Sequence, residues 1–298
     1  MTASTGRAAI RARRRARFTA VLREIGSHPS AVIGAVLLLA IIVLALLAPA
    51  IMPIDRLDVT KVTADANESP SGGHWLGTDP SGRDVLGLLL WGSRASLLVG
   101  FSATAIAMII GTVFGMAAGH FAGVSRAVVL RIIDFFLVVP SLVLAIVLST
   151  VLSRGLTTII IAIGVTCWAQ TARVVRAQTL TIETRPYIER SRALGAGDVH
   201  IIGKHVFPAV LPLVMANTTL TVGSAIILES TLAFLGLGDP TTFSWGTMLK
   251  TALDTGAATA GYWWFVLSPG IAIVVVVLCF TLVGRALEAV LNPTLRAR

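Results

Sequence analysis

The chain has 298 residues, of which 55% are hydrophobic and 13% charged, with a formal net charge of +9. So few charged residues cannot cover so much apolar surface in water, which excludes an ordinary soluble domain and predicts an integral membrane protein. The basic excess is typical of arginines on the cytoplasmic side of a membrane. No polar domain interleaves aromatic and basic residues, so we expect no nucleic-acid partner.

The cysteine and histidine residues indicate neither a disulfide framework nor a metal site. Cys167 and Cys279 lie inside apolar runs, and the five His residues are scattered without paired carboxylates or cysteines near them. We therefore expect this chain to bind no metal and no cofactor.

Six apolar stretches are long enough to cross a bilayer, which takes about 20 residues in a helix. Lipid leaves unpaired backbone groups unsatisfied, and the stretches lack the period of two of barrel strands, so each is predicted to be helical. The sequence thus predicts an all-α integral membrane protein with six transmembrane helices. The predicted spans are Ala31–Ile51, Ala95–Gly119, Phe135–Ser153, Gly155–Ala172, Val206–Leu228 and Thr255–Gly284, the first part of the last lying outside the spanning helix.

The basic residues orient these spans. With the N-terminus inside, roughly three of every four of the 24 Lys and Arg residues fall on the inner side, which predicts that both termini are cytoplasmic. Residues 1–30 form a basic cytoplasmic segment, 31–94 the first helix and an extracytoplasmic loop, and 95–298 a core of five helices. A cleaved secretory signal is the alternative for the N-terminus, but the apolar run is longer than about 15 residues and further helices follow.

Two local patterns carry packing predictions. In the outer loop, Asp79-Pro80-Ser81-Gly82 is a turn sequence in which Asp79, Arg83 and Asp84 are able to pair, the alternative being an ordinary polar loop. In the second span, Gly111, Gly115 and Gly119 recur at every fourth position, which predicts close approach of a neighbouring helix.

A polar insert, YIERSRALGAGDVHIIGKHVFP at residues 187–208, separates the fourth and fifth spans. Pro186 and Glu189 suit the first turn of a helix, Gly195 ends it, and Asp198 is a good N-cap for a second helix. Two short helices joined by a glycine turn form a compact element that is able to fit a groove on a partner protein. The alternative is a solvated interfacial loop whose charge only maintains the topology.

The fifth span carries polar residues at membrane depth. Asn217 and Thr221 belong to a polar band that suits either a pore lining or helix–helix hydrogen bonds. Glu229 has three interpretations: it lines the translocation path, it pairs with Arg94 or another base at the outer edge, or it reaches outer water.

The spacing of Glu189, Gly195 and Pro208 resembles the EAA motif of ABC importer permeases. Arg190 and Ser191 replace the usual Ala-Ala, and His205 stands at a position that is usually hydrophobic. In that family the insert forms the coupling helix, which docks into a cleft of the cytoplasmic ATPase. The resemblance assigns this contact to Tyr187, Glu189, Arg190, Ser191, Ala193, Leu194, Gly195, Ala196, Asp198, His205 and Pro208.

Three further segments resemble the C-type subunits of dipeptide and oligopeptide permeases. They are HWLGTDPSGRDVLGLLLWGSRASLLVG from His74, ILESTLAFLGLGDPTTFSWGTML from Ile227, and WWFVLSPGIAIVVVVLCFTLVGRALEAVLNPTLRAR from Trp263. Their order identifies the chain as a member of that family over roughly residues 20–298, which implies a type I ABC importer permease fold in the bacterial inner membrane.

The resemblance also implies function and partners. The chain would form the pore by alternating access, with a homologous second permease subunit, one or two ATPase subunits that carry ATP and Mg²⁺, an extracytoplasmic solute-binding protein, a peptide substrate and surrounding lipid. It has no phosphate-binding loop of its own and is not expected to be an enzyme. The alternatives are import of nickel or another small solute, a stand-alone secondary transporter or channel, and a membrane-embedded enzyme.

Overall fold

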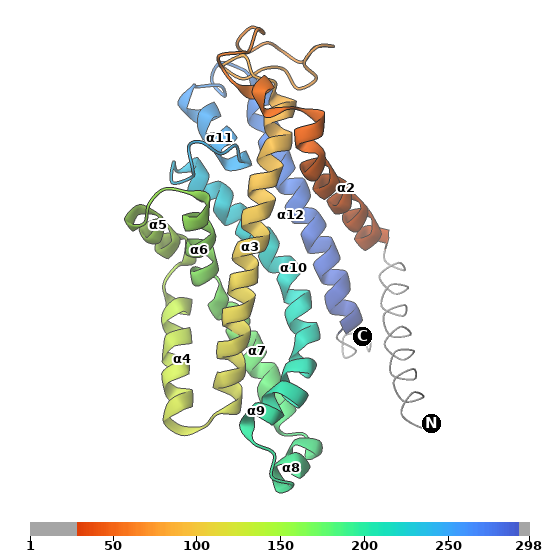
Figure 1. The fold of residues 1–298 in the computed structure, drawn as a ribbon, viewed down its shortest axis with the longest axis vertical. Helices are drawn as coiled ribbons and strands as arrows, with labels where there is room; N and C mark the ends of the chain where they lie inside the picture. Colours follow the sequence, from red (N-terminus) through yellow and green to blue (C-terminus); the bar gives the residue numbers. More distant parts are fainter. Residues whose placement is uncertain (1–28, 292–298) are drawn as a thin grey trace.

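The computed structural model describes residues 29–291, in which the regular secondary structure is helical, without a β-strand (Figure 1). The predicted cytoplasmic segment 1–30 and the end of the C-terminal motif therefore fall largely outside the described residues. A π-helical turn, Ile202–Val206, joins α9 (Asp198–Ile201) to α10 (Phe207–Phe234). The helices are α2 Pro29–Ile51, η1 Ile54–Leu57, α3 Val85–His120, α4 Gly123–Val138, α5 Ser141–Val151, α6 Leu156–Thr166, α7 Trp168–Glu183, α8 Pro186–Ala193, α9 Asp198–Ile201, α10 Phe207–Phe234, α11 Trp245–Asp254 and α12 Trp263–Leu291.

Within the described residues, five helical segments are long and apolar enough to cross a membrane, and there are six if the bent pair α4 and α5 counts as one span. The predicted span Phe135–Ser153 is not one continuous helix, because α4 and α5 meet at an angle of 90°. Pro140 lies at this bend. Proline lacks the N–H that would continue the helix, and it drives the preceding Val139 into an extended conformation.

The second span begins at Val85 rather than at the predicted Ala95. The carboxylate of Asp84 caps this longer helix by accepting the N–H of Leu86 at 2.8 Å. The last span begins at Trp263, so the prediction that the first part of Thr255–Gly284 lies outside the helix is confirmed.

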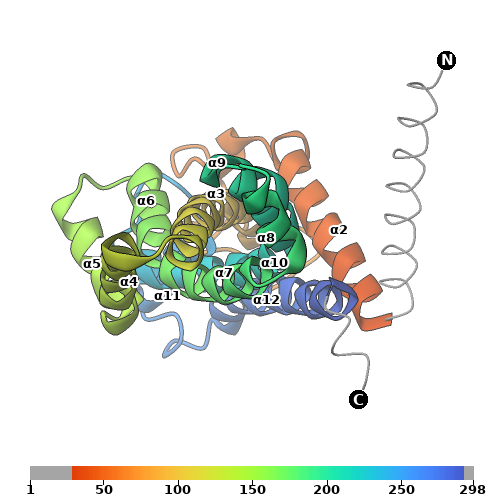
Figure 2. The ribbon, with the colours of Figure 1, turned by 90° about the horizontal axis from the view of Figure 1, so that it is seen from below.

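The long helix α3 lies at the centre of the bundle and packs against α7, α10, α6 and α2. Seen along the bundle, α2 and α12 lie on one side of α3, and α4, α5 and α6 on the other (Figure 2). The chain runs toward the α11 end in α2, α4 and α10, and back in α3, α7 and α12 (Figure 1). Pro29 and Leu291 therefore lie at the ends of their helices that point toward α8 and α9.

Small residues bring α3 and α7 together, as the glycine spacing predicts. A Cβ atom on Gly115 would lie 2.6 Å from the carbonyl oxygen of Ala172 and 2.7 Å from Cβ of Val175. A Cβ atom on Gly111 would lie 2.7 Å from the carbonyl oxygen of Trp168. Only glycine at these positions lets the two backbones approach so closely, so this contact fixes α7, and the insert that follows it, against the central helix.

The loop between α2 and α3 folds around a buried carboxylate. Asp79 is fully buried, and its Oδ2 lies 2.6 Å from Nη2 of Arg83, which confirms the predicted pairing. Its Oδ1 accepts the backbone N–H groups of Ser81 and Arg83, each at 2.8 Å, and Gly82 takes a φ of +79°. The indole of Trp264 donates to the carbonyl of Thr78 at 3.3 Å and ties the loop to α12.

Candidate functional site: the insert and the polar clusters of the bundle

The insert protrudes at the end of the bundle opposite to α11 (Figure 1). It forms the two helices that the sequence predicts, with Pro186 and Glu189 in the first turn of α8. Gly195 ends α8 with a φ of +86°, and no atom lies within 4 Å of a Cβ built on it, so backbone conformation rather than crowding requires glycine. The prediction that Asp198 is the N-cap of α9 is wrong, because Gly197 is the cap and Asp198 is the first helical residue.

The insert has one face buried in the bundle and an apolar tip. Ile188, Ile201 and Val206 are fully buried and pack in a cluster with residues of α3, α7 and α10. By contrast, Leu194 and Val199, on either side of the glycine turn, are 82% and 88% exposed. Water disfavours two large aliphatic side chains at a protruding tip, which is the character of a surface that a partner covers.

Between the two short helices lies an open hollow of about 560 Å³. The rings of Tyr187 and His205 face each other across it, with centroids 5.8 Å apart. Predicted contact residues that line it are Tyr187, Arg190, Ser191, Leu194, Gly195, Ala196 and His205, joined by Gly197, His200 and Lys204. Glu189, Ala193, Asp198 and Pro208 are exposed outside it.

The sequence does not predict that His200 and Lys204 line the hollow, because their positions depend on how α9 continues through the π-helical turn into α10. A π-helical turn shifts the side chains that follow relative to an α-helix. The residue pattern of the insert alone carries no signal of that shift.

At the base of the insert, four side chains from four helices form a polar cluster. Nδ1 of His120 lies 2.6 Å from Oε1 of Glu183, and its Nε2 lies 3.1 Å from Oδ1 of Asp198. Arg192 donates to the second oxygen of Glu183 at 2.5 Å. The two ring nitrogens face different carboxylates on opposite edges of the imidazole, and within residues 29–291 no three such side chains converge as metal ligands.

A polar pocket of about 610 Å³ opens at mid-bundle, where α10 faces the bend between α4 and α5. Asn217 and Thr221, one turn apart on α10, both line it together with Gln170 and Ser224. The amide of Asn217 donates to Oγ1 of Thr171 on α7 at 2.9 Å, and Thr221 donates to the carbonyl of Asn217 at 3.0 Å. Asn217 therefore makes the helix–helix hydrogen bond that is one of the two predicted roles, and the pore-lining role stays a prediction.

Glu229 is enclosed within the bundle and is only 1% exposed. Its Oε2 accepts the hydroxyls of Ser96 at 2.9 Å and Ser230 at 3.2 Å. Ser96 in turn accepts the backbone N–H of Trp245 at 3.3 Å, so the cluster joins α3, α10 and α11. The interpretation that Glu229 reaches outer water is wrong, and its role in the translocation path stays a prediction.

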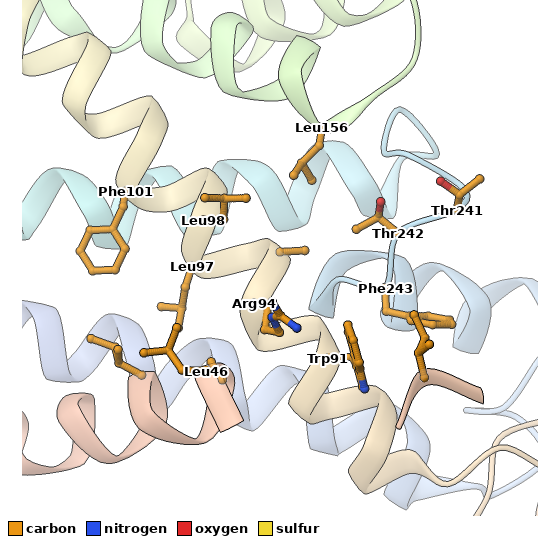
Figure 3. A pocket seen from close by; sticks show the side chains of 14 residues that line it. Leu46, Trp91, Arg94, Leu97, Leu98, Phe101, Leu156, Thr241, Thr242 and Phe243 are labelled. Atoms are coloured by element: carbon orange, nitrogen blue, oxygen red, sulfur yellow. The ribbon is translucent and has the colours of Figure 1, made fainter. Parts of the chain in front are cut away.

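Glu229 forms no ion pair among the described residues, so the interpretation that it pairs with Arg94 or another base is also wrong. The guanidinium of Arg94 instead lies 4.9 Å from the ring centroid of Trp91. Arg94 and Trp91 project from α3 into a largely apolar pocket of about 510 Å³ (Figure 3). Leu46 of α2, Leu156 of α6 and Phe243 before α11 complete its wall.

Comparison with known proteins agrees with this architecture. The family model described as binding-protein-dependent transport system inner membrane component matches residues 111–297, and the N-terminal transmembrane domain of oligopeptide transport permease C matches residues 18–70. The inward-facing MetNI methionine ABC transporter has a TM-score of 0.55 and 23% identity, covering 68% of this chain and 96% of that one, which supports the fold.

Curated relatives align over most of their length. The dipeptide transport system permease protein DppC of Bacillus subtilis (strain 168) is 36% identical over 275 residues, 92% of this chain and 85% of the relative. The glutathione transport system permease protein GsiD of Pectobacterium atrosepticum is 33% identical over 271 residues, 90% of this chain and 88% of the relative. The fold, the two family models and these relatives lead to one conclusion: the chain belongs to the family of binding-protein-dependent transport system inner membrane components, multi-pass permeases of ABC transporters.

Proposed function

We propose that this chain is a pore-forming permease subunit of an ATP-driven importer of dipeptides and oligopeptides. The observation that carries the proposal is the insert, whose exposed Leu194 and Val199 form an apolar tip beside a hollow rimmed by Arg190 and Lys204. The names of its relatives support peptides as the substrate class, since the 36% identical proteins are dipeptide and oligopeptide transport permeases.

The insert is where an ATPase subunit docks, on the cytoplasmic side, and the chain has its N- and C-termini on that side. The basic residues of the sequence favour this orientation. The loop between α2 and α3, together with α11, then faces outward, where a solute-binding protein delivers the substrate. A second, homologous permease subunit completes the pore, and ATP and Mg²⁺ are held by the ATPase subunits.

The architecture explains how nucleotide-driven motion would reach the pore. The insert, with α8 and α9, connects α7 to α10. Helices α7 and α10 meet at mid-bundle, where the amide of Asn217 donates to the hydroxyl of Thr171. A displacement of the insert therefore acts on both walls of the polar pocket. ATP binding and hydrolysis on the partner change transport only if they shift the relative free energy of two arrangements of these helices.

Cysteine cross-linking tests the docking. In the complex purified with its ATPase, Leu194→Cys and Val199→Cys should each form a cross-link to the ATPase subunit with a short bifunctional thiol reagent. Val124→Cys is the matched control, because Val124 is 80% exposed and lies at the same end of the bundle on α4, outside the insert. Equal cross-linking at Val124, or none from the insert, would refute the docking.

The substrate class is tested on the solute-binding protein that co-purifies with the complex. Its affinity for dipeptides, tripeptides, longer peptides, glutathione and Ni²⁺ is measured by calorimetry. We expect tight binding of peptides, and a binding protein that takes only Ni²⁺ or glutathione would contradict the proposed substrate.

A further inference from the structure

A histidine at the end of the central helix makes the polar contact between α3 and the insert. His120 is the last residue of α3, and its side chain is only 2% exposed. Glu183 is the last residue of α7, and Asp198 is the first residue of α9. The imidazole therefore touches both the helix that leads into the insert, α7, and the second helix of the insert, α9.

Each ring nitrogen of His120 faces a carboxylate. A neutral imidazole carries one N–H group and donates one hydrogen bond, but both ring nitrogens of His120 lie within 3.1 Å of a carboxylate oxygen. The imidazolium form donates to both carboxylates, whereas the neutral form would set one nitrogen lone pair against a carboxylate. Hydrogen bonds between charged groups are roughly twice as strong as neutral ones, so these contacts connect α3 to α7 and α9 more strongly than neutral hydrogen bonds would.

The surroundings of His120 fit a cation. The C-terminal end of α3 carries the negative end of the helix dipole, where a positive side chain is stabilised. Arg192 from α8 also binds Glu183, and Arg126 from α4 donates to the carbonyl of Phe121 at 2.8 Å rather than to either carboxylate. The cluster thus has two acidic side chains to share between His120 and Arg192.

We propose that His120 is a positioning residue that clasps the insert to the central helix α3 through its two ring nitrogens, so that displacement of the insert is carried into the bundle. The buried Ile188, Ile201 and Val206 hold the insert against α3, α7 and α10. Apolar contacts are not directional, whereas two hydrogen bonds on opposite edges of one ring fix its orientation relative to α3. This inference rests on the proposed docking of an ATPase at the insert.

The test measures how many ATP molecules are hydrolysed for each substrate transported, in proteoliposomes that contain the complete complex with its binding protein. His120→Phe keeps a ring and removes both donors. The variant is expected to fold, because the side chain of Asp198 is 64% exposed to water and Glu183 keeps Arg192. We expect the ATP used per substrate to rise at least about tenfold.

Two further variants separate a clasp from a general structural role. His120→Gln retains two N–H donors on one nitrogen and should restore part of the transport yield. Asp134→Asn is the control, since it removes an exposed carboxylate on α4 that forms no ion pair among the described residues, and it should leave the ratio unchanged.

Cross-linking from Leu194→Cys, added to each variant, distinguishes the two proposals. An unchanged ATP ratio in His120→Phe with the cross-link intact would overturn the clasp and leave the docking standing. A cross-link absent already with His120 in place would overturn the docking, and the clasp with it. A cross-link lost only in His120→Phe would show that His120 maintains the shape of the insert instead of transmitting its motion, which also overturns the clasp.

Discussion

Replacing Gly115 with alanine tests the contact that fixes α7 against the central helix. The added methyl group would lie 2.6 Å from the carbonyl oxygen of Ala172 and 2.7 Å from Cβ of Val175. Carbon atoms at ordinary contact are about 3.5–4.0 Å apart, so the helices must separate by several tenths of an ångström along this seam. Overpacking of this kind costs about 1–3 kcal/mol, and we expect Gly115→Ala to lose about 2 kcal/mol of stability.

Gly270→Ala is the matched control, because Gly270 lies inside α12 with nothing within 4 Å of a Cβ atom. There the change adds only the greater helix propensity of alanine, worth up to about 1 kcal/mol. Thermal unfolding in lipid nanodiscs, followed by tryptophan fluorescence, should give a midpoint about 6 °C lower for Gly115→Ala and an unchanged or higher one for Gly270→Ala. Equal midpoints for the two variants would refute the close packing of α3 on α7.

Three more predictions concern the other polar clusters. Glu229→Leu removes the acceptor of buried serine hydroxyls and should cost about 2 kcal/mol, whereas Glu229→Gln keeps an acceptor and should cost less; equal unfolding midpoints would contradict this. Asp79→Ala leaves the mostly buried guanidinium of Arg83 unpaired and should expose the loop between α2 and α3 to limited proteolysis, and an unchanged digestion pattern would count against it. Hydrogen bonds from Thr241 hold the pKa of the Asp239 carboxyl below its usual range. This stabilisation is present above the unfolded pKa of about 3.9 and is lost as the pH falls through the lower folded value, so hydrogen exchange of the loop before α11, corrected for intrinsic rates, should accelerate only in strong acid.

The positions of the spans show how far periodicity and hydropathy reach. Apolar composition locates a span because lipid solvates any apolar side chain, whatever its neighbours. Hydropathy does not locate the bend at Pro140, and a proline alone does not mark it either, because Pro49, Pro212 and Pro269 lie inside helices. Only the packing of α5 against α6 shows where the second half goes. The start of α3 was missed for a related reason, since Val85 lies before the uncharged stretch.

The insert shows the same division within one segment. Pro186, Glu189 and Gly195 act on the backbone of their own turn, so their roles were readable from local sequence. The local sequence around Asp198 predicts an N-cap. In the structure its carboxylate instead lies 3.1 Å from Nε2 of His120, which is 78 residues away along the chain.

The sequence by itself determined that this protein is a helical membrane protein, which family it resembles, and where its polar insert lies, because these follow from composition and from short-range spacing. The tertiary structure decided which polar side chains meet: Glu229 with Ser96 rather than Arg94, and His120 with Glu183 and Asp198. The physical reason is that a buried polar group takes the partner that close-packed helices bring within about 3 Å, and that choice depends on the rotation and approach of each helix.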